Sequence, residues 1–284
     1  LPVFTMLDLP LMVGGKPMTF ETGRIAKQAE SAVLVTYGDT QVLVTLCYGP
    51  ARPGIGFFPL TCDYVEKTYA AGKIPGGFFK REGRLRDDEI LTCRLMDRPC
   101  RPLFADGFKM ETQLMATVMS SDKENKADVL ALTGASLAIH LSCLPWDGPI
   151  CRIRVGRLDG EFVANPTIEQ IEQSDIDIIV ACSKDAIVMV EGGGEEISEQ
   201  ELADALDFAQ QAAKPVIELI EELREAVGKK KMDFKPPTLD APIASRVAEL
   251  VDADLDKASR VRDKHARYAG YDELKKTMIE TLKE

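Results

Sequence analysis

Residues 31–49, SAVLVTYGDTQVLVTLCYG, hold two runs rich in β-branched residues, separated by Gly38 and Asp39. A Gly-Asp pair suits a tight turn between two strands, so this stretch predicts a β-hairpin. Residues 150–166 and 175–194 repeat the pattern of two apolar runs around a short polar turn. Three hairpins need a shared core to bury their sheet faces, and this requirement limits the fold to classes that contain antiparallel sheets.

Two helical patterns come between these hairpins. Residues 87–98 carry acidic side chains in what would be the first helical turn, where they are favourable for the helix dipole. Pro99 and Pro102 are expected to end this helix. Residues 127–144 are strongly apolar and contain Gly134, Ala135 and Ser136 in succession. We expect this second segment to form a buried helix that packs closely on a sheet.

A third helix is predicted to begin at Ser198 and to end at Gly228. Ser198 and Glu201 have capping-box spacing, and Pro215 is expected to kink or divide the helix. Helices mixed with antiparallel hairpins predict an α+β fold.

A proline-rich linker, GKKKMDFKPPTLDAP, follows this helix. Beyond it the sequence is a charged, amphipathic helical segment. We therefore predict two domains, 1–230 and 231–284, with the second mainly helical.

Charge is unevenly distributed along the 284 residues. The net charge is −11, which argues against general binding of polyanions over the whole surface. Residues 67–101 nevertheless hold nine basic against five acidic residues, whereas residues 191–227 hold two against eleven. A nucleic acid can therefore bind at one place on an acidic protein.

The seven cysteines contain no C-x-x-C pair, which is typical of reduced thiols. No apolar run is long enough to span a bilayer, and the first ten residues carry no basic n-region. These features predict a cytoplasmic protein without membrane contact.

The segment GKIPGGFFKREGR places two aromatic residues beside two basic ones: Phe78, Phe79, Lys80 and Arg81. Phenylalanine rings stack on unpaired bases, and basic side chains contact phosphates, so together they suit single-stranded RNA. The alternative is a local aromatic cluster with solvated charges. The pattern alone leaves both interpretations open.

Arg94 and Arg98 share one face of the predicted helix at residues 87–98, and Arg101 extends this stripe if the prolines permit it. Guanidinium groups in line suit phosphate oxygens. Pairing with Asp97, or with the other nearby acids, is the alternative.

Other patterns give little support for catalysis. His140 lies in an apolar helix and is expected to be a core residue. Asp175 and Asp177 alternate on one strand and are weak candidates for magnesium ligands. We predict no catalytic residue and no metal ligand in these residues.

Longer motifs identify a resemblance. FFPLTCDYVEKTYAAGKIPGGFFKREGR, EILTCRLMDRPCRPLFADGF and LALTGASLAIHLSCLPWDGPI resemble, in this order, the first core of the polynucleotide phosphorylase (polyribonucleotide nucleotidyltransferase) family. The resemblance implies a ribonuclease-PH-like core, with mixed sheets packed against helices as in ribosomal protein S5 domain 2. It makes residues 1–230 this core and residues 231–284 the start of an all-helical domain.

Members of that family are homotrimeric rings that degrade single-stranded RNA from its 3′ end. They use inorganic phosphate as co-substrate, release nucleoside diphosphates and bind Mg²⁺ in a second core. KH and OB-fold domains follow that core. The resemblance also implies contacts with other RNA-degradation proteins and no membrane.

The family's second core carries serines before its G-A-S helix and a D-x-K pattern on a later strand. The corresponding residues here are Lys126-Ala127-Asp128 and Asp177-Ile178-Ile179. We therefore expect this core to thread RNA and support ring assembly without catalysing phosphorolysis. The RNA-binding residues would be as follows: Phe78, Phe79, Lys80, Arg81, Arg94, Arg98 and Arg101.

Two other hypotheses remain. One is a self-sufficient ribonuclease-PH-like exoribonuclease in which Asp177 binds the metal. The other is a non-catalytic scaffold whose arginines are purely structural.

Overall fold

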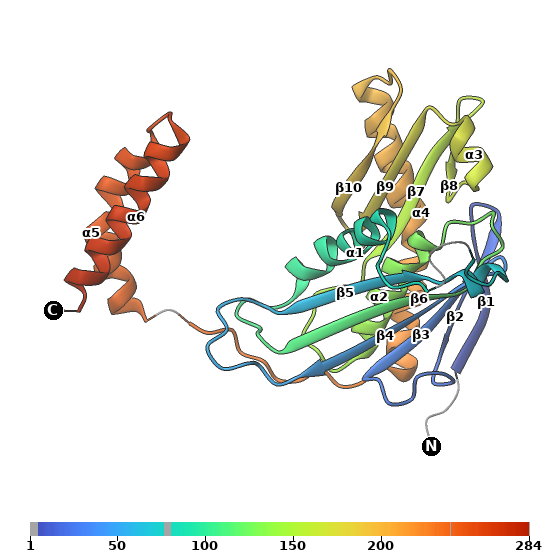
Figure 1. Cartoon of the computed structure of the whole chain (residues 1–284), viewed down its shortest axis with the longest axis horizontal. Helices are drawn as coiled ribbons and strands as arrows, with labels where there is room; N and C mark the ends of the chain where they lie inside the picture. The colour runs from blue at the N-terminus through green and yellow to red at the C-terminus, as the bar shows by residue number, and fades with distance from the viewer. Residues whose placement is uncertain (1–4, 77–80, 239, 284) are drawn as a thin grey trace. The chain divides into compact units, whose positions relative to one another are not determined.

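The computed structural model of the chain describes residues 5–76, 81–238 and 240–283 (Figure 1). Its internal contacts divide the chain into two compact units, Leu1–Lys235 and Pro236–Glu284. The first unit is an α+β fold with two sheets, as the sequence predicts.

The larger sheet has six strands in the order β1-β2-β3-β4-β6-β5. Neighbouring strands are antiparallel except β5 and β6, which run parallel and are joined through helix α1. The predicted hairpin at residues 31–49 forms its β3–β4 pair. The bounds are β1 Thr5–Val13, β2 Lys16–Thr22, β3 Ser31–Tyr37, β4 Thr40–Gly49, β5 Leu60–Glu66 and β6 Glu111–Ser120.

The smaller sheet has four antiparallel strands in the order β10-β9-β7-β8. It is built from the other two predicted hairpins, so both of those predictions are confirmed. The bounds are β7 Cys151–Leu158, β8 Glu161–Ala164, β9 Ile176–Cys182 and β10 Ile187–Gly194.

Helix α2, Ala127–Leu141, is the centre of the core and contacts strands of both sheets (Figure 1). Nearly all its side chains are buried, as its apolar sequence predicts. Two hydroxyl groups of α2 accept hydrogen bonds from backbone amides at the start of β7. The Ser136 hydroxyl accepts from the Ile150 amide at 2.9 Å, and the Thr133 hydroxyl accepts from the Arg152 amide at 3.3 Å. These bonds fix the helix against the start of β7.

Helix α1, Asp87–Cys100, covers β5, and helix α4, Glu199–Val227, packs on β7, β9 and α2. The predicted capping box at Ser198 and Glu201 is present. Three short helices complete the unit: η1 Thr68–Ala71, η2 Arg101–Leu103 and α3 Ile168–Gln173.

The prolines in the long helices have different outcomes: α1 ends at Cys100, between Pro99 and Pro102 as expected, whereas Pro215 does not divide α4. Helix α1 includes Pro99 in its last turn, and α4 continues through Pro215 without a break. Ala213, Val216 and Ile217 are buried around Pro215. Burial of this face on both sides of the proline outweighs its cost of about 3 kcal/mol, so the helix is not divided.

The lysine-rich segment after α4 is not a free linker. The amides of Lys229 and Met232 donate to the carbonyls of Leu141 and Cys143 at 2.8 and 2.7 Å. The Lys231 ammonium donates to the Ile139 carbonyl at 3.0 Å. Because the last carbonyls of a helix lack intrahelical partners, this segment caps the end of α2, and the first unit extends to Lys235.

The second unit contains helices α5, Ala241–Ser259, and α6, Lys264–Thr281, which contact each other. Asp240 and Asp263 cap their first turns through side-chain oxygens. Neither helix buries a residue within its described length. Their packing therefore contributes little core of its own.

Replacement of Gly134 by alanine should destabilise the first unit. A Cβ at this position would lie 2.7 Å from Val44 Cγ2 and 2.9 Å from Val35 Cγ2, and these buried β-branched side chains have little freedom to move. We expect a loss of about 1–3 kcal/mol in the free energy of unfolding, measured by urea denaturation. Gly49→Ala is the matched control, because its Cβ meets nothing within 4 Å. Equal stability of the two variants would contradict the close packing.

Candidate functional site

The aromatic part of the predicted RNA-binding segment, Phe78, Phe79 and Lys80, lies outside the described residues. Arg81 follows directly and is exposed, as is Arg84. The described part of this segment therefore presents two basic side chains to solvent just before α1.

The start of α1 is fixed to the end of β5 by Glu89, whose side chain is 4% exposed. One carboxylate oxygen accepts from the Glu66 amide and the other from the Arg86 amide, both at 2.7 Å. The Arg86 guanidinium also donates to Glu66 at 2.7 Å. The sequence shows that this turn is acidic. It does not show that Glu89 joins the helix to a strand, because the Glu66 amide that donates to Glu89 lies 23 residues away.

The three arginines of the predicted stripe have different surroundings. Arg94 is exposed and has no ion pair among the described residues. Arg98 pairs with Glu191 of β10 at 2.9 Å, and the two side chains are 65% and 54% exposed.

Arg101 is partly exposed, and its guanidinium bonds within the fold. It pairs with Asp97 at 2.8 Å, donates to the carbonyls of Phe58 and Leu60, and lies over the Phe58 ring. The pairing that the sequence left open thus forms at Arg101, through Asp97. Arg94 and Arg98 are the members of the stripe that face solvent.

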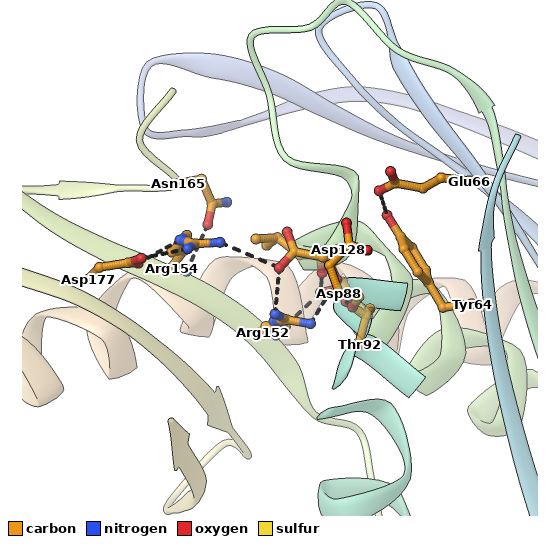
Figure 2. Close-up of polar contacts among 11 residues, drawn as sticks. Tyr64, Glu66, Asp88, Thr92, Asp128, Arg152, Arg154, Asn165 and Asp177 are labelled. Carbon is orange, nitrogen blue, oxygen red and sulfur yellow. Dashed lines mark hydrogen bonds and ion pairs between the residues drawn. The ribbon is translucent and has the colours of Figure 1, made fainter. Parts of the chain in front are cut away.

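A second polar site lies where α2 begins (Figure 2). Arg152 and Arg154 are two residues apart on β7 and so point to the same face of the sheet. Asp128, in the first turn of α2, accepts from Arg152 at 2.8 Å and contacts Arg154 at 3.5 Å. Asp177 of β9 accepts two hydrogen bonds from Arg154, at 2.7 and 2.6 Å. Two arginines and two aspartates thus form one charge-balanced cluster.

Burial decides the electrostatics of this cluster. Arg152 is completely buried and Asp128 is 15% exposed in its side chain. Burial lowers the pKa of Arg152, while the charge of Asp128 opposes this effect. Burial also acts to lower the pKa of Arg154, but the hydrogen bonds to Asp177 raise it overall. Both guanidinium groups therefore remain charged, and each needs its carboxylate partner.

A cavity of about 260 Å³ adjoins the cluster. Its polar lining includes Tyr64, Glu66, Asp88, Thr92, Asn125 and Asp128. Tyr64 donates to Glu66 across one side (Figure 2), and burial raises the pKa of the Tyr64 hydroxyl, so that it stays protonated.

The residues here do not fit a magnesium site. Asp177, the weak candidate for a ligand, is occupied by Arg154, and Asp175 is occupied by Arg157. Within the described residues, no group of three or more histidine, cysteine or acidic side chains is placed to hold a metal ion. They do not fit phosphate at the start of α2 either, because the Asp128 carboxylate already lies between the two arginines there.

Burial holds several other reactive side chains in their neutral forms. Burial lowers the pKa of His140 to about 4, and the ring packs against Trp146. His140 is nevertheless only half-buried, and its Nδ1 has no hydrogen-bond partner among the described residues, so the expectation of a satisfied core residue is not confirmed. All seven cysteines are free thiols. Burial raises the pKa of Cys62, Cys93 and Cys100, which keeps them in the unreactive thiol form.

Two family models match the first unit in sequence order. The 3′ exoribonuclease family, domain 1, matches residues 14–145, and domain 2 of the same family matches residues 148–212. The chain belongs to the 3′ exoribonuclease family. The boundary between the two matches falls just before β7, so the first match covers β2 to β6 of the larger sheet and the second covers the whole smaller sheet.

Curated relatives confirm the narrower resemblance. The polyribonucleotide nucleotidyltransferase of Sorangium cellulosum is 65% identical over 96% of this chain, and that of Nitratidesulfovibrio vulgaris is 48% identical over 99%. The enzyme of the same name from Myxococcus xanthus is 47% identical over 98%. The chain spans 36% to 39% of the length of these relatives.

A solved structure confirms the fold. The crystal structure of rice (Oryza sativa) Rrp46 superposes with a TM-score of 0.58 at 14% identity, over 73% of this chain and 94% of that one. The predicted α+β, ribonuclease-PH-like architecture is therefore confirmed. Within the part of the chain that the structure describes, none of the helices is both long and apolar enough to cross a membrane.

Removal of Asp128 should destabilise the first unit strongly. Asp128→Ala leaves Arg152 charged, buried and without its carboxylate, which typically costs about 3–5 kcal/mol. Chemical denaturation of the variant measures this loss. Glu221→Gln is the control, because the Lys184–Glu221 pair is largely exposed and should contribute less than about 1 kcal/mol. A loss below about 1 kcal/mol for Asp128→Ala would show that Arg152 does not depend on this pair.

Proposed function

We propose that the chain is the first core, with the beginning of the helical domain, of a polyribonucleotide nucleotidyltransferase. The full-length protein would degrade single-stranded RNA from the 3′ end by phosphorolysis and release nucleoside diphosphates. The identity of 47% to 65% to relatives of that name, over nearly the whole chain, carries the proposal.

We assign this core a role in RNA threading and ring assembly and no catalytic role. Charge pairing supports this division: Asp128 and Asp177 are both held by arginines, and the D-x-K lysine is replaced by the buried Ile179. An isoleucine supplies no charge to stabilise a developing anion. Phosphate, as co-substrate, and Mg²⁺ would be bound by the second core.

The remaining parts of the proposal follow from the family. The full-length protein would be a cytoplasmic homotrimer that contacts other RNA-degradation proteins. Residues 1–230 would be the first core and residues 231–284 the start of the all-helical domain. The separation of the two compact units after Lys235 supports a division in this region.

RNA would pass the segment of Phe78, Phe79, Lys80 and Arg81 and then the exposed face of α1. The exposure of Arg81, Arg94 and Arg98 supports phosphate contacts there. Arg101 belongs to the same predicted set, but its guanidinium already bonds within the fold. We therefore assign phosphate contacts to Arg94 and Arg98 in preference to Arg101.

Loss of the two aromatic rings should weaken RNA binding by the full-length protein. Stacking contributes about 1–3 kcal/mol per base, so Phe78→Ala with Phe79→Ala should raise the Kd for oligo(A) by about tenfold or more. Fluorescence anisotropy with labelled RNA measures the change. Phe57→Ala removes another exposed ring and is the matched control. Unchanged RNA affinity in the double variant would remove the segment from the proposal.

The chain by itself should not phosphorolyse RNA. With oligo(A), magnesium and inorganic phosphate, we expect no release of ADP above background by chromatography, because Asp177 is paired and the lysine is absent. The full-length protein is the positive control. Phosphate-dependent release of ADP by this chain would instead support the hypothesis of a self-sufficient exoribonuclease.

A further inference from the structure

Glu82 is an acidic residue in the middle of a basic surface segment. It lies next to Arg81 and two residues before Arg84, and all three are exposed. A negative charge here opposes the attraction of phosphates by its neighbours. On electrostatic grounds alone, Glu82 would weaken RNA binding. Its hydrogen bonds within the fold give a different reason for an acidic residue at this position.

The Glu82 carboxylate is bonded to the start of helix η1. Its Oε1 accepts from the Thr68 amide at 2.7 Å, and the Lys67 ammonium donates to the Glu82 carbonyl at 3.3 Å. The N-cap residue of η1, Lys67, makes no side-chain cap of its own. Glu82 therefore supplies the missing cap from 14 residues further along the chain.

Helix η1 is itself held to the larger sheet. The Ser121 amide, directly after β6, donates to the Ala70 carbonyl at 3.0 Å. At its other end, Gly72 adopts the left-handed conformation with φ 69° and its amide caps the helix. A helix fixed in this way is a firm attachment point for the segment that Glu82 belongs to.

We propose that Glu82 is a positioning residue that holds the Arg81 guanidinium where it contacts RNA phosphates, by bonding the adjacent main chain to η1. This inference rests on the proposed RNA-binding function. It predicts an effect opposite in sign to simple electrostatics, since removal of an acid from a basic surface would otherwise tighten RNA binding.

The test compares variants of the full-length protein by their Kd for labelled oligo(A) at low and high salt. Glu82→Ala should weaken binding about three- to tenfold, because a charge-assisted hydrogen bond is lost and Arg81 is no longer held. Glu82→Gln keeps an oxygen acceptor and should retain most of the affinity. The salt dependence of the alanine variant should also decrease, because fewer phosphate contacts form.

Thr68→Pro removes the bond from the donor side. A proline is tolerated at the first position of a helix, and Lys67 before it already has the extended conformation that precedes proline. This variant should match Glu82→Ala, and the double variant should bind no worse than either single one. Asp87→Ala is the control: Asp87 is an exposed acid with no hydrogen bond or ion pair of its side chain among the described residues, so its loss should leave affinity equal or slightly tighter.

Unchanged or tighter RNA binding by Glu82→Ala, or additive losses in the double variant, would overturn the inference. Arg81→Ala separates this failure from that of the proposed function. If Arg81→Ala weakens binding and Glu82→Ala does not, only the positioning role is wrong. If Arg81→Ala has no effect, the phosphate contact of Arg81 falls and the positioning role of Glu82 falls with it, while the Phe78 and Phe79 double variant tests the rest of the segment.

Discussion

The packing of helix α2 between the two sheets is the constraint on which the rest of the first unit depends. The helix is buried on almost every side, so its polar ends have to be satisfied by the surrounding chain rather than by solvent. At the end of α2, the lysine-rich segment after α4 donates to the last carbonyls of the helix. At its start, the Arg152 guanidinium donates to the Asp128 carbonyl and pairs with the Asp128 carboxylate.

The same arrangement keeps the paired charges of this core apart from its exposed basic side chains. The charges inside the fold pair with one another, whereas Arg81, Arg84 and Arg94 are exposed near the start of α1 and along it. A surface of this kind attracts a polyanion without holding a metal or a reacting phosphate. An acidic protein can thus contain a local RNA path, because the potential at a surface depends on nearby charges more than on the net charge.

Local chemistry made much of the fold predictable from sequence. Turn residues revealed the hairpins, and Ser198 with Glu201 revealed the start of α4, because each signal lies within a few residues. The parallel β5–β6 pair has no turn to reveal it. The Asp128–Arg152 pair and the capping of α2 by Lys231 join residues 24 and 92 positions apart, so neither is visible in a local pattern. The predicted division of α4 at Pro215 does not occur, because buried residues on both sides of the proline keep the helix continuous.

The buried pair of Asp128 and Arg152 also constrains how this core can evolve. A single substitution at either residue leaves the other charge without a partner in the interior, so most one-step changes pass through a poorly folded intermediate. A serine-lined phosphate site at the start of α2 would require the aspartate and its arginines to change together. Once such a pair has formed, a different set of side chains at the start of α2 is separated from the present sequence by a stability barrier, even though the fold around it is unchanged.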